Sequence, residues 1–235
     1  MSSVKRRNLA KSRNPKNLAA QAERHHLNGR LDRAERKYRE AIALNPAYVE
    51  AHNNLGMILQ ERGRVAEATA QFVKTFEICP TDARIVFNLA RALSAQHQCR
   101  EAVVLYRQAV ALRPHFADAH FGLGLNLAQL GEYSEAEHSY RKTLQLDPHN
   151  WQARINLGLA LVEQGKVVQG LEQAEMLARE ENEAGFPHKS FGILLARAGC
   201  VEGARACFET HLLQNPDDED EIALLFATIG SARRA

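Results

Sequence analysis

Residues 49–82 read VEAHNNLGMILQERGRVAEATAQFVKTFEICPTD, and the same pattern returns every 34 residues along the chain without an insertion or a deletion. The blocks are 15–48, 49–82, 83–116, 117–150, 151–184 and 185–218. A fixed period of this length is typical of repeat proteins, because each unit is one supersecondary element that can bury its apolar face only against its neighbours. The period therefore indicates the fold before any single residue is considered.

Several block positions keep one kind of side chain. From the second block onward the seventh position is a large apolar residue, the eighth is glycine or alanine throughout, and the twenty-fourth is aromatic in five of six blocks. Apolar residues spaced by three, four and seven form a stripe on a helix. Glycine near the middle of a block and proline near its end both stop helices. Each block therefore predicts a helix, a tight turn, a second helix and a short turn, with the helices of the second block at 49–62 and 65–78.

These features resemble the tetratricopeptide-repeat family, from residue 15 to about residue 230. The resemblance implies an all-α fold, a right-handed α-solenoid of antiparallel helix pairs. It also implies a concave groove, lined by the first helix of each pair, that holds a peptide or a partner's helix. We expect a basic, disordered arm over 1–14, six repeats over 15–218, and a C-terminal capping helix and tail over 219–235, with the helix itself at about Glu221–Ile229.

Composition is that of an ordinary soluble protein, with 45% hydrophobic and 25% charged residues in 235. No stretch approaches the roughly 18 apolar residues that a membrane span requires, and no apolar run follows the basic start. We therefore expect a cytoplasmic protein without a membrane segment. The four cysteines form no CxxC pair and are expected to be reduced and buried.

Positive charge is concentrated at the N-terminus. Residues 1–16 carry six Lys or Arg and no acid, which leaves 24 basic and 28 acidic residues in the rest of the chain. We interpret this arm as a solubilising tail, because no aromatic side chains are interleaved that would stack nucleic-acid bases. The acidic run Asp217–Glu221 suits a helix N-terminus; the alternative is a docking site for the arm.

Catalytic motifs are not found. The sequence contains no HExxH, GxSxG, phosphate loop or dinucleotide fingerprint. His52, His120 and His188 share the fourth block position, but they lie two repeats apart, too far to bind one metal ion. We therefore expect no catalytic residue, no cofactor and no metal, and a protein that is not an enzyme.

Asparagine recurs at the sixth block position, in Asn54, Asn88 and Asn156. An amide both donates and accepts hydrogen bonds, so it can pair with a peptide backbone whatever the ligand's sequence. The repeats of O-linked N-acetylglucosamine transferase are similar, since they carry an asparagine ladder here that grips extended polypeptide. In this chain Gly122 interrupts the ladder. The alternative is that these amides bond to the neighbouring repeat.

Apolar and basic side chains complete the predicted binding site, because helix periodicity places them on the same face as the asparagines. The apolar residues are Met57, Phe87, Phe121 and Leu125, and the basic residues are Arg84 and Arg91. Exposed apolar patches mark interaction sites. The alternative is that these residues pack against neighbouring helices.

The predicted function is a non-enzymatic scaffold or adaptor that binds a peptide segment or a partner helix in the groove. The alternative is an accessory module of a methyltransferase or glycosyltransferase whose catalytic part is absent from this chain. Leu224, Leu225 and Phe226 are apolar for a capping helix, and they suggest a homodimer through that helix.

The fifth block departs most from the pattern. Gly170 replaces the alanine, Ala174 the aromatic residue and Asn182 the proline. Glycine inside a helix costs about 1 kcal/mol relative to alanine. We therefore expect a looser joint between the fifth and sixth blocks.

Overall fold

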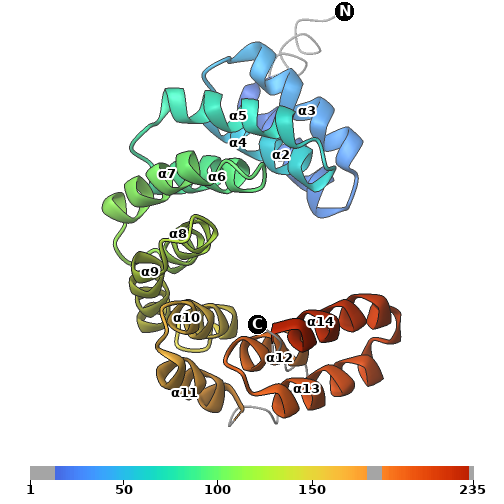
Figure 1. The fold of residues 1–235 in the computed structure, drawn as a ribbon. Helices are drawn as coiled ribbons and strands as arrows, with labels where there is room; N and C mark the ends of the chain where they lie inside the picture. The colour runs from blue at the N-terminus through green and yellow to red at the C-terminus, as the bar shows by residue number, and fades with distance from the viewer. Residues whose placement is uncertain (1–13, 179–186, 233–235) are drawn as a thin grey trace, which may run out of the picture. The chain divides into compact units, whose positions relative to one another are not determined.

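The computed structural model describes residues 14–178 and 187–232, which form antiparallel helix pairs joined by short turns (Figure 1). Among these residues there is no β-strand. The chain divides into two compact units after Pro114, close to the boundary between the third and fourth repeats. The predicted all-α solenoid of repeated helix pairs is confirmed.

The first unit contains the helix pairs of repeats 1 to 3. The helices are α2 (Pro15–Leu27), α3 (Leu31–Leu44), α4 (Val49–Glu61), α5 (Val65–Ile78), α6 (Ala83–Ser94) and α7 (Cys99–Leu112). The helices predicted for 49–82 agree with α4 and α5 to within one residue. Asn14 caps α2, since its side chain accepts a hydrogen bond from the Lys16 backbone N–H at 2.9 Å.

The second unit contains the remaining pairs and the C-terminal helix. The elements are α8 (Ala117–Gln129), α9 (Tyr133–Leu146), α10 (Trp151–Glu163), α11 (Val167–Ala178), α12 (His188–Arg197), α13 (Val201–Gln214), the 3₁₀ turn η1 (Pro216–Asp218) and α14 (Glu219–Ala232). Every helix in the described part of the chain is too short or too polar to span a lipid bilayer.

The turn inside each pair needs a left-handed backbone at one residue. Five of these residues are glycines, with φ between 68° and 83°: Gly29, Gly63, Gly131, Gly165 and Gly199. Glycine has no Cβ to clash in this conformation, so it ends the first helix at little cost. In the third pair His97 holds the same place with φ 59°, a conformation that a side chain disfavours.

Within a pair, the helices meet where a glycine faces an aromatic ring. A Cβ on Gly56 would lie 2.8 Å from the ring of Phe72, and one on Gly124 would lie 2.6 Å from the ring of Tyr140. Both rings are buried. The small residue at the eighth position and the aromatic residue at the twenty-fourth are therefore one packing contact.

Successive repeats are also joined by polar contacts at the fourth position. His52 Nε2 lies 2.9 Å from the carbonyl oxygen of Pro46, and Arg154 Nη2 donates to the carbonyl oxygen of Pro148 at 2.8 Å. In both cases the proline lies near the end of the preceding repeat. The carbonyl that proline leaves outside the helix thus obtains a buried partner.

The C-terminal helix differs from its predicted bounds, because α14 begins at Glu219 and continues to Ala232. The acidic residues of its first turn favour the earlier start, since negative charge stabilises a helix N-terminus. Ile222 is buried, and the ring of Phe226 packs edge-on to Phe208 with centroids 5.3 Å apart. Of the three residues suggested for a homodimer contact, Leu224 is the exposed one, at 65%.

Two expectations from the sequence concern residues that lie largely outside the described ranges. The basic arm predicted at 1–14 lies outside the described residues except for Asn14, and so does the segment 179–186 that joins repeats 5 and 6. The looser joint therefore stays a prediction.

Candidate functional site

A cleft of about 420 Å³ lies among the first helices of repeats 1, 2 and 3. It is lined by Glu23, Val49, Glu50, Asn53, Asn54, Asp82, Arg84, Ile85 and Asn88. The register explains this set, because the residues of α4 and α6 come from the first two turns of each helix, on the face away from the packed seventh and eighth positions. Three of the predicted site residues, Asn54, Arg84 and Asn88, are brought together here.

Side-chain amides form a continuous chain of hydrogen bonds along this cleft. Asn88 Nδ2 donates to Asn53 Oδ1 at 2.8 Å, and Asn53 Nδ2 donates to Asn54 Oδ1 at 3.2 Å. Asn54 Nδ2 then donates to the Tyr38 hydroxyl oxygen at 3.1 Å. The chain crosses from α6 through α4 to α3, so three repeats fix its geometry.

This network does not use all the hydrogen-bonding groups of its amides. An asparagine amide offers two N–H donors and one acceptor oxygen. Within the described residues, one N–H of Asn54 and one N–H and the Oδ1 of Asn88 are not used by the chain. Asn54 and Asn88 therefore bond to the preceding repeat, as the alternative predicted, while their contact with a ligand stays a prediction.

The carboxylates of the cleft outnumber its bases. Glu23, Glu50 and Asp82 face one base, Arg84. Arg84 is bound to Asp82, with Nη2 and Oδ2 3.1 Å apart, and these hydrogen bonds lower the pKa of Asp82. Because Arg84 is neutralised locally, the cleft as a whole is acidic.

Two tyrosine hydroxyls support the cleft. Burial raises the pKa of Tyr38, whose hydroxyl accepts from Asn54. The Tyr48 hydroxyl donates to Glu50 Oε2 at 3.0 Å, and its burial, together with that hydrogen bond, raises its pKa to about 12. Both groups therefore remain neutral near neutral pH, and Tyr48 keeps Glu50 oriented.

Phe87, Arg91 and Met57 belong to the first unit but not to the cleft lining. The Phe87 ring packs edge-on to Tyr106 with centroids 5.9 Å apart, and the Arg91 guanidinium lies 5.8 Å from the centre of the Phe87 ring. Met57 is half-buried against the core. Part of the apolar surface expected here is therefore used in packing.

Phe121, Leu125 and Asn156 belong to the second unit. Phe121 and Leu125 are half-buried, and the Phe121 ring centroid lies 6.1 Å from that of Tyr140. Asn156 Nδ2 donates to the Gln152 carbonyl oxygen at 2.8 Å. The buried Tyr140 hydroxyl has no hydrogen-bond partner among the described residues, unlike Tyr38 in the first unit.

Sequence reasoning missed Asn53 and Glu23 as cleft residues. Asn53 occupies the fifth block position, beside the sixth-position asparagines on the same helix face, so the period itself could have identified it. Glu23 stands at the ninth position of the first repeat, where a single glutamate gives no distinctive signal. Within residues 14–178 and 187–232, no group of three or more His, Cys, Asp or Glu side chains is placed to hold a metal ion.

Three models of one repeat family match the chain. Two are described as tetratricopeptide repeat, one matching residues 87–148 and 123–182 and the other matching 48–115. The third, described as TPR repeat, matches 22–63. No curated protein gives a match in sequence.

Solved structures share the fold. MamA matches with 27% identity and a TM-score of 0.62, covering 67% of this chain and 96% of its own. PilF of Pseudomonas aeruginosa matches with 18% identity and a TM-score of 0.74, covering 93% of this chain and 97% of its own. YrrB, described as a TPR protein with an unusual peptide-binding site, matches with 20% identity and a TM-score of 0.65, covering 74% of this chain and 90% of its own.

Proposed function

Since this chain belongs to the tetratricopeptide-repeat family, we propose that it is a non-enzymatic protein-interaction scaffold that holds a polypeptide segment in the cleft among α2, α4 and α6. The observation that carries this proposal is the amide chain from Asn88 to Tyr38. Its remaining donors and acceptor match the N–H and C=O groups of a peptide backbone. Fixing the amides by bonds to neighbouring repeats lowers the entropy lost on binding.

The acidic lining adds a preference for the ligand's side chains. Glu23 and Glu50 are not neutralised by a described basic residue of the cleft, so a Lys or Arg of the ligand gains an ion pair there. We therefore propose a segment that is basic rather than acidic. YrrB, a TPR protein with an unusual peptide-binding site, supports the choice of a polypeptide ligand.

The remaining predicted site residues are proposed as further contacts outside the cleft. Phe87, Arg91 and Met57 are proposed as further contacts within the first unit for a ligand longer than the cleft, and Phe121, Leu125 and Asn156 as contacts of the second unit by itself. Their half-buried rings and the exposed Arg91 leave partial surface for such a ligand.

A peptide panel tests this proposal directly. Dye-labelled ten-residue peptides of basic, neutral and acidic composition are titrated with the full chain, and binding is followed by fluorescence anisotropy. We expect the basic peptides to bind most tightly, and the double variant Asn54→Ala/Asn88→Ala to lower their affinity at least tenfold. Gln145→Ala, which removes an exposed amide from α9, is the matched control.

The variant results separate the parts of the proposal. Glu50→Gln should weaken basic peptides more than neutral ones, because only the charge changes. Asn156→Ala should lower peptide affinity if the second unit contributes a contact of its own. Equal affinity of the double variant and the control, with folding intact by circular dichroism, would contradict the assignment of the cleft.

A further inference from the structure

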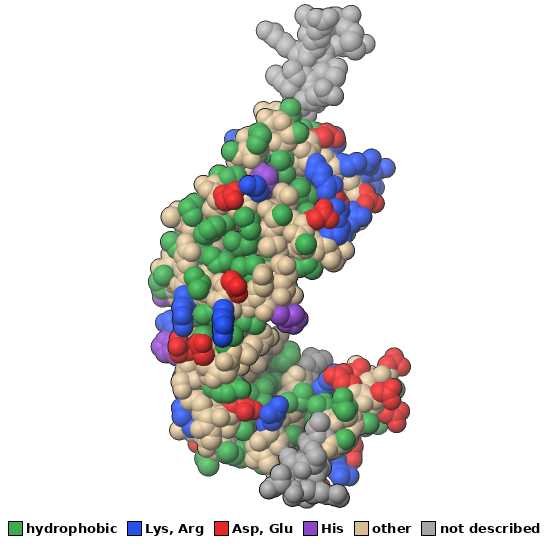
Figure 2. Space-filling view, turned by 45° about the horizontal axis from the view of Figure 1, so that its top comes forward, with side chains coloured by type: hydrophobic (Ala, Val, Ile, Leu, Met, Phe, Trp, Pro, Cys, Tyr) green, Lys and Arg blue, Asp and Glu red, His purple; other side chains and the backbone are tan. Residues whose placement is uncertain are grey.

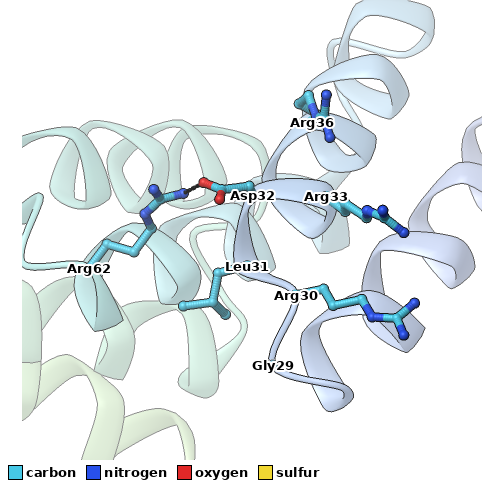
Figure 3. A pocket seen from close by; sticks show the side chains of 7 residues that line it. All are labelled: Gly29, Arg30, Leu31, Asp32, Arg33, Arg36 and Arg62. Carbon is cyan, nitrogen blue, oxygen red and sulfur yellow. Dashed lines mark ion pairs between the residues drawn. The ribbon is translucent and has the colours of Figure 1, made fainter.

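The turn between α2 and α3 carries a basic cluster that shares no residue with the cleft described above. A second cleft, of about 670 Å³, is formed there (Figure 3). It is lined by Gly29, Arg30, Leu31, Asp32, Arg33, Arg36 and Arg62. Four of its seven residues are arginines, whereas Asp32 is its one acid.

Three of the four guanidinium groups lack a carboxylate partner among the described residues. Arg62 is neutralised, because its Nη1 lies 2.7 Å from an oxygen of Asp32 and 2.7 Å from one of Glu35. Arg30, Arg33 and Arg36, here called the arginine cluster, are exposed and have no such ion pair. Figure 3 shows Arg30 and Arg33 extending to the same side, away from Arg62.

The corresponding turns of later repeats have different charges. The residue aligned with Arg33 is Glu67, Glu101 or Glu135 in the next three repeats. An acid in the first turn of a helix is stabilised by the helix dipole, while a base is disfavoured. Arg64, aligned with Arg30, is itself paired with Glu67 and Glu35. In α3 the first-turn acid is Asp32, which pairs with Arg62, so the first repeat has no carboxylate at the place where Glu67 pairs with Arg64.

Basic side chains beside the arginine cluster add to the positive charge at this surface. The pKa of His25 is lowered by loss of solvation and by the charges of Arg33, Arg30, Lys37 and Arg24. Figure 2 shows Lys and Arg side chains, with some Asp and Glu among them, gathered on one flank of the first unit. An anion bound here would relieve the repulsion among these cations.

We propose that the arginine cluster docks an acidic segment of a partner protein, at a site separate from the polypeptide-binding cleft. The planar guanidinium group binds carboxylates through two parallel hydrogen bonds, which gives geometry as well as charge. Leu31 offers an apolar contact between the arginines, so an acidic segment with an interspersed apolar residue fits the lining.

A protein segment fits this lining better than a nucleic acid does. No aromatic side chain is among the lining residues, so bases would have nothing to stack on. Asp32 also lies in the wall, where it opposes the closely spaced phosphates of a nucleic-acid backbone. A peptide can place its carboxylates on the arginines and avoid Asp32.

The test uses the full chain and a dye-labelled nine-residue peptide of the repeating sequence Glu-Glu-Leu. Fluorescence anisotropy is measured at low and at high salt. We expect binding at low salt that weakens as salt is raised, and at least a tenfold loss of affinity in Arg33→Glu/Arg36→Glu. The control Lys74→Glu/Arg100→Glu makes the same change in net charge elsewhere on the first unit and should retain binding.

Loss of folding cannot imitate this result, because Arg33→Glu adds a second acid to the first turn of α3, beside Asp32, and should leave the melting temperature unchanged or higher. Equal losses in the two double variants would overturn the proposal, since binding would then follow net charge alone. Tighter, arginine-dependent binding of a ten-nucleotide oligo-dT or of phosphatidylserine vesicles would also overturn it, in favour of a nucleic acid or a membrane surface.

Discussion

In repeat 2 the glycine of α4, Gly56, faces the ring of Phe72 from α5, whereas in repeat 5 the equivalent glycine of α10, Gly158, faces Leu194 from α12 of the following repeat. Ala174 stands in α11 where repeat 2 has Phe72, and it is buried. Leu194 is also buried and joins Ala174 in one core cluster. The volume that α11 lacks is therefore supplied by the next repeat.

The comparison teaches that the interior depends on filled volume rather than on one residue type. Gly170 belongs to the same change, since a Cβ there would lie 2.9 Å from the Gly158 carbonyl oxygen. Small residues at 158, 170 and 174 let α10 and α11 approach closely, and Leu194 occupies the space above Gly158. Repeat 5 is thus packed differently, and its core is shared with repeat 6, since Phe191 and Leu194 belong to the same cluster as Ile155, Ala174 and Leu177.

Truncation of the filling side chain should have the largest effect. We expect Leu194→Ala to lower the free energy of unfolding by about 2–5 kcal/mol, in the range of Phe72→Ala in repeat 2, at about 3–5 kcal/mol, because each leaves a cavity against a glycine. Urea denaturation followed by circular dichroism measures both. A cost below about 1 kcal/mol for Leu194→Ala would show that it does not fill the place of the ring.

Restoring the aromatic residue should come next in size. Ala174→Phe should lower the free energy of unfolding by about 1–3 kcal/mol, because Leu194 already occupies the space. Combined with Leu194→Ala, the same change should cost less than the sum of the two single variants, which a double-mutant cycle measures. Stabilisation by Ala174→Phe alone would mean that repeat 5 is only a weakened copy of repeat 2.

The sequence predicted the fold closely, but it did not predict that Leu194 takes the place of the aromatic ring in repeat 5. The period located Gly56 and Phe72 and the bounds of α4 and α5, because local spacing determines them. It also identified Asn54, Asn88 and Arg84 as sharing a face. It interpreted Gly170 and Ala174 only as weaknesses, since the contact of Leu194 with Gly158 links different repeats. The free arginines of the first repeat were likewise missed, because ion pairs such as Arg64 with Glu35 depend on tertiary structure.

Gly170→Ala separates helix propensity from packing and should have a smaller effect. Propensity alone predicts a gain of about 1 kcal/mol. A Cβ at 170 would lie 2.7 Å from Val162 Cγ2 and 2.9 Å from the Gly158 carbonyl oxygen, so we expect a net loss instead. Gly203→Ala in α13 is the matched control, since its Cβ would lie 3.2 Å from the flexible Leu195 side chain. Urea midpoints that rise in both variants would contradict the close approach of α10 and α11.

The turn between the two helices of a repeat, here called its rim, should differ least between repeats 2 and 5. In both repeats, side chains of this turn donate hydrogen bonds to a carboxylate on the second helix of the preceding repeat. Glu35 accepts from Arg62 and Arg64 of repeat 2, each at 2.7 Å. Glu137 accepts from Gln164 of repeat 5 at 3.0 Å and from Lys166 at 2.9 Å. Burial alone would raise the pKa of Glu137, but hydrogen bonds from Lys166, Gln164 and Arg141 outweigh it and lower the pKa from 4.5 to about 2.

The stabilisation linked to Glu137 is therefore present above the unfolded pKa, near 4.5, and is lost as the pH falls toward 2. Solvent screening at this rim reduces it to about 1 kcal/mol. Urea midpoints measured between pH 2.5 and 6 should fall less steeply with acid in Glu137→Gln than in the unmodified chain. Glu35→Gln should flatten the profile in the same direction, because the pKa of Glu35 is also lowered, by hydrogen bonds from Arg64 and Arg39 that outweigh its burial. If only one of the two variants altered the pH profile, the rims of repeats 2 and 5 would differ as their interiors do.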